Sequence, residues 1–95
     1  MANQKYIFRG DRSGVFYGEM GIRNGQEVQI INCRRLWYWE GAASLSQLAL
    51  EGVKKPRECK FTVTVDSLTI TDLIEFISCT EAACSSIDGV PVWKM

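Results

Sequence analysis

The chain has 95 residues, of which 46% are hydrophobic and 23% charged, as is ordinary for a globular protein, and we expect a single domain over residues 1–95. Its 11 basic and 11 acidic residues cancel, which argues against long nucleic acid as a partner. No apolar run reaches membrane-spanning length and no signal peptide is recognisable, so we expect a soluble, cytoplasmic protein with no membrane partner. Because so small a domain buries a limited share of its surface, we also expect a homo-oligomer, either a dimer or a tetramer.

The first 39 residues predict three strands joined by turns. The expected strands are residues 5–9, 15–22 and 26–39. Between the second and third, Asn24-Gly25 predicts a type I′ hairpin turn, because both residues tolerate the positive φ that its central positions need. The third strand is expected to bend at Asn32.

Residues 41–53 predict the corner at which this strand enters a short helix. Ser44 and Gln47 have the spacing of a capping box, so the helix should begin near Leu45. Gly52 fits the position just after the helix, and Pro56 prevents its continuation.

The last third of the chain predicts strands, a second helix and an extended arm. The strands are expected at residues 61–65 and 68–77, interrupted at Asp66-Ser67. A helical alternative for residues 71–77 stays open, although their Thr and Ile content favours a strand. Thr80 should cap a helix that ends near Ile87, and residues 89–94 form an arm that docks on its own core or reaches a neighbouring subunit. These elements predict an α+β fold, with a mainly antiparallel twisted sheet or partial barrel and two short helices.

The residue types argue against an enzyme. The chain has no histidine, its acids are scattered singly, and its four cysteines form no Cys-x-x-Cys pair, so we expect no catalytic residue, no metal and no cofactor. The cysteines are expected to be reduced and mostly buried. Cys33 beside two arginines is a weaker candidate for an activated thiolate, and a structural thiol is favoured.

The residues around the strand-to-helix corner favour anion binding. The loop at 41–44 has no bulky side chain, so a phosphate could approach the free N–H groups of the helix that follows. Ser44 and Ser46 could donate hydroxyl hydrogen bonds, and Arg34 or Arg35 could bind a phosphate with two parallel hydrogen bonds.

The same stretch also contains the parts that recognise a base. Strand alternation places Arg35, Trp37 and Trp39 on one face, where an indole could stack on a base. Gln47 or Glu40 could then read a base edge. The candidate ligand-binding residues are therefore Arg34, Arg35, Trp37, Trp39, Glu40, Ser44, Ser46 and Gln47. A purely structural corner with its aromatics in the core explains the pattern about equally well.

Long segments of this chain also resemble a known group of sequences. The stretch from Arg34 to Ala49, the Glu51-Gly52-Val53 that follows, the Pro56…Cys59-Lys60-Phe61 segment and the closing Val90-Pro91-Val92-Trp93-Lys94 are similar, in order over residues 15–95, to a family of small tailed-phage proteins of unassigned function.

The resemblance implies a phage protein that acts in the host cytoplasm. By its parts the chain also resembles the phage anti-CBASS sponge proteins, which oligomerise and hold cyclic oligonucleotide immune signals. The function expected from this likeness is sequestration of a small cyclic nucleotide without cleavage, as a form of immune evasion. The alternative is a protein-binding inhibitor of a host defence system or a small structural phage component, in which the aromatic cluster is core or interface.

Overall fold

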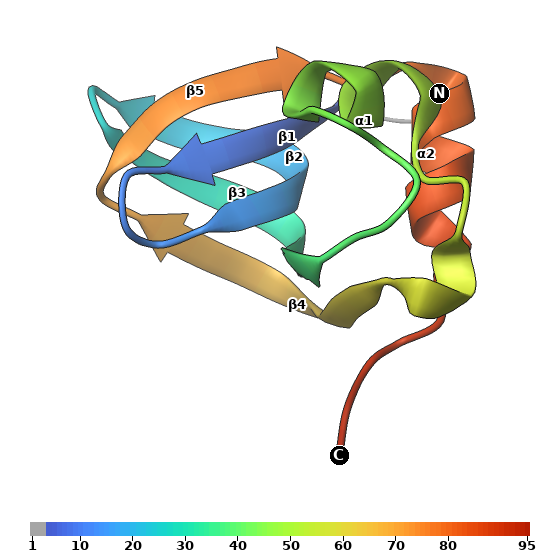
Figure 1. Cartoon of the computed structure of the whole chain (residues 1–95). Coiled ribbons are helices and arrows are strands. Elements are labelled where there is room, and N and C mark those ends of the chain that lie inside the picture. The colour runs from blue at the N-terminus through green and yellow to red at the C-terminus, as the bar shows by residue number, and fades with distance from the viewer. Residues whose placement is uncertain (1–3) are drawn as a thin grey trace.

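The computed structural model describes residues 4–95, and within them one five-stranded antiparallel sheet packs against two short α-helices (Figure 1). The strands are β1 (Lys5–Gly10), β2 (Val15–Asn24), β3 (Glu27–Tyr38), β4 (Lys60–Ile70) and β5 (Leu73–Ser78). The helices are α1 (Leu45–Glu51) and α2 (Glu81–Asp88), with one 3-10 turn, η1, at Pro56–Glu58. The strand order β4-β3-β2-β1-β5 confirms the predicted α+β class with an antiparallel twisted sheet.

The β2–β3 hairpin lies where it was predicted, but its turn is of another kind. Asn24 pairs with Glu27, so the two central residues are Gly25 and Gln26. Only Gly25 of these has a positive φ, of 64°. Glycine at the first central position is the pattern of a type II′ turn, so the predicted type I′ turn with Asn24 at its centre is wrong.

The predicted bend at Asn32 is confirmed as an irregularity in the β2–β3 ladder. Asn32 has φ 51°, and the register shifts between Tyr17 and Glu19 on the opposite strand. At Gly18, between them, a Cβ atom would lie 2.7 Å from the Ile30 side chain and 2.8 Å from a backbone oxygen. Glycine is therefore needed there, because the two strands approach too closely for any side chain.

The fourth strand is longer than the sequence predicts. It continues through Asp66-Ser67, because Ser67 pairs with Ile31 of β3 and its hydroxyl accepts a hydrogen bond from Gln29. The pairing with β3 overrides the local turn preference of these residues. The chain turns instead at Thr71-Asp72, and β5 confirms the strand reading for the residues after it.

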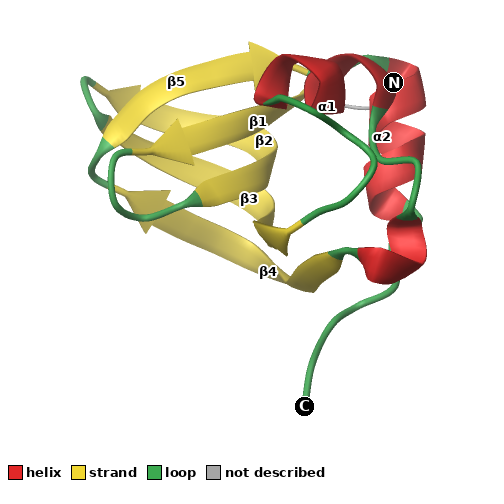
Figure 2. Cartoon of the chain, viewed as in Figure 1, coloured by secondary structure: helices red, strands yellow, loops and turns green. Residues whose placement is uncertain are grey.

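Two buried clusters lie on the two faces of the sheet. The helices cover one end of one face (Figure 2), where the core contains Ile7, Tyr17, Leu36, Leu48, Phe61 and Ile87, among others. The second cluster is formed by Phe8, Phe16, Val28, Ile30, Cys33, Ile70 and Leu73. No helix of the described residues belongs to this second cluster, so the sheet buries these side chains by coiling over its own concave face.

No helix within residues 4–95 is long and apolar enough to cross a membrane.

Asp72 joins the turn between β4 and β5 to the loop between β1 and β2. One carboxylate oxygen accepts hydrogen bonds from the backbone N–H groups of Arg12 (2.7 Å) and Ser13 (2.9 Å) in the β1–β2 loop. The other accepts the Ser13 hydroxyl at 2.6 Å. These bonds favour the charged form, and they lower the pKa of Asp72 below its ordinary value of 3.8. The carboxylate therefore fixes the loop that lines the cavity described below.

We predict that Asp72→Asn lowers the melting temperature at pH 7. Because the folded-state pKa is lowered, the stabilisation by Asp72 is present above pH 3.8 and is lost as the pH falls through the folded-state value. The difference between wild type and variant should thus shrink in acid. Melting curves from pH 7 to pH 2.5 measure this, with Asp66→Asn, an exposed acid on β4, as the control. A difference that is constant over this range contradicts the prediction.

Candidate functional site

Arg34 and Arg35 are neighbours on β3, yet they have opposite environments. Arg34 is 5% exposed and points to the helix side of the sheet. Its Nε donates to the Thr62 carbonyl at 2.8 Å, Nη1 to the Ile87 carbonyl at 2.9 Å and Nη2 to the Val90 carbonyl at 2.7 Å. Burial lowers the pKa of Arg34 below its ordinary value, and the opposing effect of the Asp88 charge offsets only part of this shift. Every nitrogen of this guanidinium has a partner, so the prediction that Arg34 binds phosphate is corrected to a structural role.

Arg35 lies on the opposite side of β3, at an open cavity of about 530 Å³. The cavity is lined by Arg12, Ser13, Phe16, Arg35, Leu68, Thr69, Ile70, Thr71 and Asp72. Arg35 Nη1 donates to the Ser13 carbonyl at 2.8 Å, and the guanidinium carbon lies 4.5 Å from the centre of the Phe16 ring. Among residues 4–95 this is the one hydrogen bond that the guanidinium donates, so Nε and Nη2 stay available.

The charges around the cavity favour an anion. Arg12 and Arg35 contribute two positive charges, and Asp72 contributes one negative charge. The Asp72 oxygens already accept hydrogen bonds from the β1–β2 loop. Thr69 alternates with Leu68 and Ile70 along β4, so its side chain lies on the opposite face with Gln29, and only its backbone can contribute to this cavity. A phosphate group fits this combination of charge and donors.

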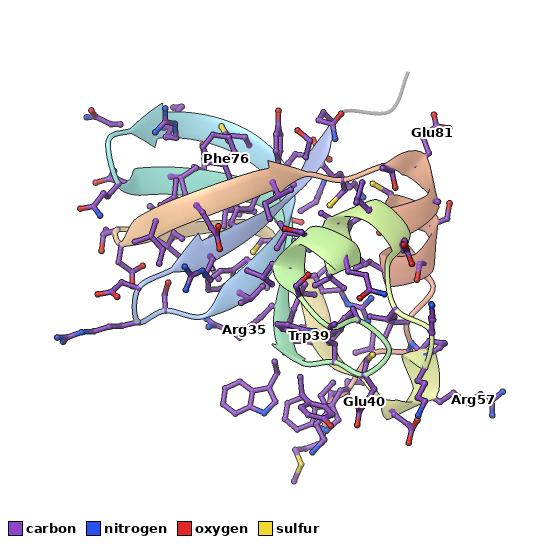
Figure 3. The ribbon with its side chains drawn as sticks, turned by 45° about the horizontal axis from the view of Figure 1, so that its top comes forward. Arg35, Trp39, Glu40, Arg57, Phe76 and Glu81 are labelled. Atoms are coloured by element: carbon purple, nitrogen blue, oxygen red, sulfur yellow. The ribbon has the colours of Figure 1, made fainter. Side chains whose placement is uncertain are left out.

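Trp37 and Trp39 do not share one face, and the prediction that they do is wrong. Trp37 is 63% exposed, whereas Trp39 packs against the helix-side core (Figure 3). The strand ends at Tyr38, and the β3–β4 register already shifts between Leu36 and Tyr38. Strand alternation therefore stops before Trp39. Of the two indoles, Trp37 is the one on which a base could stack.

The start of α1 is closed by its own side chains. The Ser44 hydroxyl accepts the Gln47 N–H at 3.1 Å, and Gln47 Oε1 accepts the Ala43 N–H at 2.8 Å. The predicted capping box is confirmed, and it occupies donors that a phosphate would need. Gly41 has φ 90°, and a Cβ there would lie 2.4 Å from the Lys54 nitrogen. Gly41 thus packs closely against the chain at Lys54. The predicted roles of Ser44 in phosphate binding and of Gln47 in reading a base edge are corrected to the capping of α1.

The other two predicted site residues lie apart from the cavity. Glu40 accepts a hydrogen bond from the Tyr38 hydroxyl at 2.7 Å, which raises the pKa of Tyr38. Ser46 is exposed on α1. Figure 3 shows Glu40 below Trp39 and away from Arg35. The structure thus brings neither residue to the cavity.

Comparison with protein families gives one match. The model of DUF6948, a domain of unknown function, matches residues 3–87. The chain belongs to this family. Neither curated proteins nor solved structures gave a match.

The cysteines of this DUF6948 chain behave as structural thiols. Cys33, Cys59 and Cys79 are buried and Cys84 is partly buried, and all four are free. Burial raises the pKa of Cys33 to about 12, although Arg35 lowers it. Because a neutral, buried thiol is a poor nucleophile, the structure favours the structural thiol over the weaker alternative of a Cys33 thiolate. Among residues 4–95 no group of three His, Cys, Asp or Glu side chains could hold a metal ion.

Most of the residues that line the cavity at Arg35 were not predicted from the sequence. Its remaining wall comes from the β1–β2 loop and from the end of β4, which are more than 50 residues apart in the chain but meet when the sheet coils. Arg12 lies in a turn-forming segment without any motif, and Thr69 and Thr71 lie in a strand pattern. No local signal marks these residues as neighbours of Arg35.

We predict that Arg34→Ala destabilises the fold and that Arg35→Ala does so far less. Removing Arg34 takes a donor from the Thr62 and Val90 carbonyl groups and leaves the Ile87 carbonyl with only the Val90 N–H, which should lower the free energy of unfolding by about 3 kcal/mol. Urea unfolding of the two variants measures the difference. Equal losses for both would show that the buried guanidinium has no special structural role.

Proposed function

We propose that this protein binds and sequesters a cyclic oligonucleotide without cleaving it, and that it does so in the host cytoplasm as a phage counter-defence protein. The observation that carries the proposal is the open cavity at Arg35, where the guanidinium keeps two nitrogens, Nε and Nη2, without a partner among residues 4–95 and lies close to Arg12 on the cavity wall. Trp37 follows two residues later and offers an aromatic face to a base.

The geometry supports one phosphate and one base near each other. Arg34 and Leu36 point to the helix side, so Arg35 and Trp37 lie on the other side of β3. Two residues along a strand span about 6.8 Å, which is the scale of one nucleotide. A phosphate held by Arg35 therefore places a base within reach of Trp37. We further propose a homo-oligomer, because a cyclic dinucleotide presents two phosphates and two bases to two copies of the chain.

The second candidate is a protein-binding inhibitor of host defence. Val63 and Val65 are exposed on β4, which is an edge strand of the sheet. Exposed β-branched residues at a free edge favour pairing with another strand. Under this alternative the cavity at Arg35 has no ligand.

We predict that a cyclic dinucleotide stabilises the protein and is recovered intact. The probes are 3′,3′-cyclic di-AMP, 3′,3′-cyclic GMP-AMP, cyclic tri-AMP and their linear forms. A ligand at about 100 times its Kd adds about 2.7 kcal/mol, which raises the melting temperature of a domain of this size by roughly 10 °C or more. Chromatography of the ligand after incubation tests for cleavage, and the solution mass with and without ligand tests for the oligomer.

The decisive variant is Arg35→Gln, which should weaken binding by about tenfold to a hundredfold, because a charged hydrogen bond to phosphate is lost. Arg57→Gln is the matched control, since Arg57 is exposed on η1 away from Arg35 (Figure 3). Arg35→Lys keeps the positive charge and separates charge from hydrogen-bond geometry. No thermal shift with any probe rejects the proposal and directs the search to capture of a protein partner through β4.

A further inference from the structure

Residues 92–93 of the C-terminal arm pair with the start of β4, and Trp93 contacts Trp37. The backbone N–H of Trp93 donates a hydrogen bond to the Phe61 carbonyl at 2.8 Å, and Val92 forms a parallel β-bridge with Phe61. This places the Trp93 indole against Trp37, with ring centroids 6.3 Å apart and planes 15° from parallel. The arm, shown in red in Figure 1, thus builds an aromatic pair, Trp37–Trp93, beside the start of β4.

Both rings of the aromatic pair are exposed to solvent, although each ring contacts neighbouring residues. Trp37 is 63% exposed and Trp93 is 41% exposed. At this centroid distance the two nearly parallel rings are offset, so Trp93 overlaps only part of one face of Trp37 and leaves the other face open. Lys60 Nζ lies 5.6 Å from the centre of the Trp93 ring. A cation–π contact of this kind restricts the Trp93 ring and adds positive charge next to the pair.

Stacking on Trp93 has a consequence for the open face of Trp37. An isolated indole at the surface exchanges between rotamers, and a ligand that stacks on it must first order it. Trp93 restricts Trp37 before any ligand arrives, so the open face is already oriented. Positive charge from Lys60 and Arg35 on either side suits a phosphate-linked base better than an uncharged apolar side chain.

We propose that the C-terminal arm is part of the nucleotide site, with Trp93 as a positioning residue that holds Trp37 so that its open face stacks on a base of the ligand whose phosphate binds at Arg35. This inference rests on the proposed function. It goes beyond that function by adding Trp93 and Lys60 to the site and by assigning separate roles to the two tryptophans. Trp37 contacts the base, and Trp93 acts through Trp37.

The test compares Trp93→Ala with Trp93→Phe in titrations with 3′,3′-cyclic di-AMP, followed by calorimetry and by quenching of tryptophan fluorescence. Trp93→Ala should weaken binding by about tenfold, as expected when the stacking of one base is impaired, and Trp93→Phe should restore most of the affinity. Trp37→Ala should weaken binding at least as much. Met95→Ala is the control within the arm, since its exposed side chain belongs to no ring contact.

A probe without a base separates the two parts of the site. Inorganic pyrophosphate should compete with the dinucleotide at Arg35, and its affinity should fall in Arg35→Gln but not in Trp93→Ala. Melting curves of all variants without ligand show whether the arm is merely structural, because a loss of affinity in Trp93→Ala at an unchanged melting temperature is the result expected of a positioning residue.

The outcomes separate this inference from the function on which it rests. If the wild type binds the dinucleotide through Arg35 and Trp93→Ala binds equally well, the role of the arm is rejected and the proposed function stands. A change in the solution mass of Trp93→Ala without ligand would show that the aromatic pair is a subunit contact, which also rejects it. If the wild type binds no probe, the proposed function fails and the inference fails with it.

Discussion

The buried guanidinium of Arg34 is the interaction on which the arrangement of this protein depends. It joins β3 to the Thr62 carbonyl of β4 and to the Ile87 and Val90 carbonyls at the end of α2. A positive charge at a helix C-terminus also interacts favourably with the helix dipole. One side chain therefore ties the second helix to the sheet and fixes where the C-terminal arm begins. Because successive side chains of a strand point to opposite faces, the inward position of Arg34 places Arg35 on the other face of β3.

The site follows from the coiling of the sheet. The irregularity at Asn32 and the missing side chain of Gly18 let β2 and β3 approach and bend. The bend brings the end of β4 toward the β1–β2 loop, where Asp72 closes the gap by accepting backbone and hydroxyl hydrogen bonds from that loop. The cavity at Arg35 lies over this closure. Its walls are held by contacts that exist without a ligand, which lowers the ordering cost of binding.

Local chemistry was predictable from the sequence, and long-range placement was not. Ser44 and Thr80 were expected as helix caps and accept the N–H groups of Gln47 and Ala83, because capping needs residues only three positions apart. Strand alternation predicted that Arg34 and Arg35 lie on opposite faces of β3, but which of the two faces is buried depends on the packing of α2 and of the chain after it.

The end of β3 at Tyr38 is another feature that no local pattern shows. It depends on a register shift against β4, and it decides that Trp37 is exposed while Trp39 packs on the core. Trp93 was placed in an extended arm with two alternatives, and its stacking on Trp37 shows that the arm docks on its own chain. Ser44 and Gln47, which the sequence analysis assigned to a ligand site at the corner before α1, stabilise that corner instead.

Binding energies connect the proposed site to the expected oligomer. One charged hydrogen-bonded phosphate contributes about 1.5–3 kcal/mol and one stacked base about 1–3 kcal/mol, which together correspond to a Kd in the millimolar range or somewhat below it. Sequestration of a scarce signal needs tighter binding than this. A cyclic dinucleotide held between two copies doubles the contacts to about 5–12 kcal/mol, and the upper half of this range reaches micromolar affinity or better before ordering costs. A site of this modest size on one chain therefore suits a sponge only when two chains share the ligand.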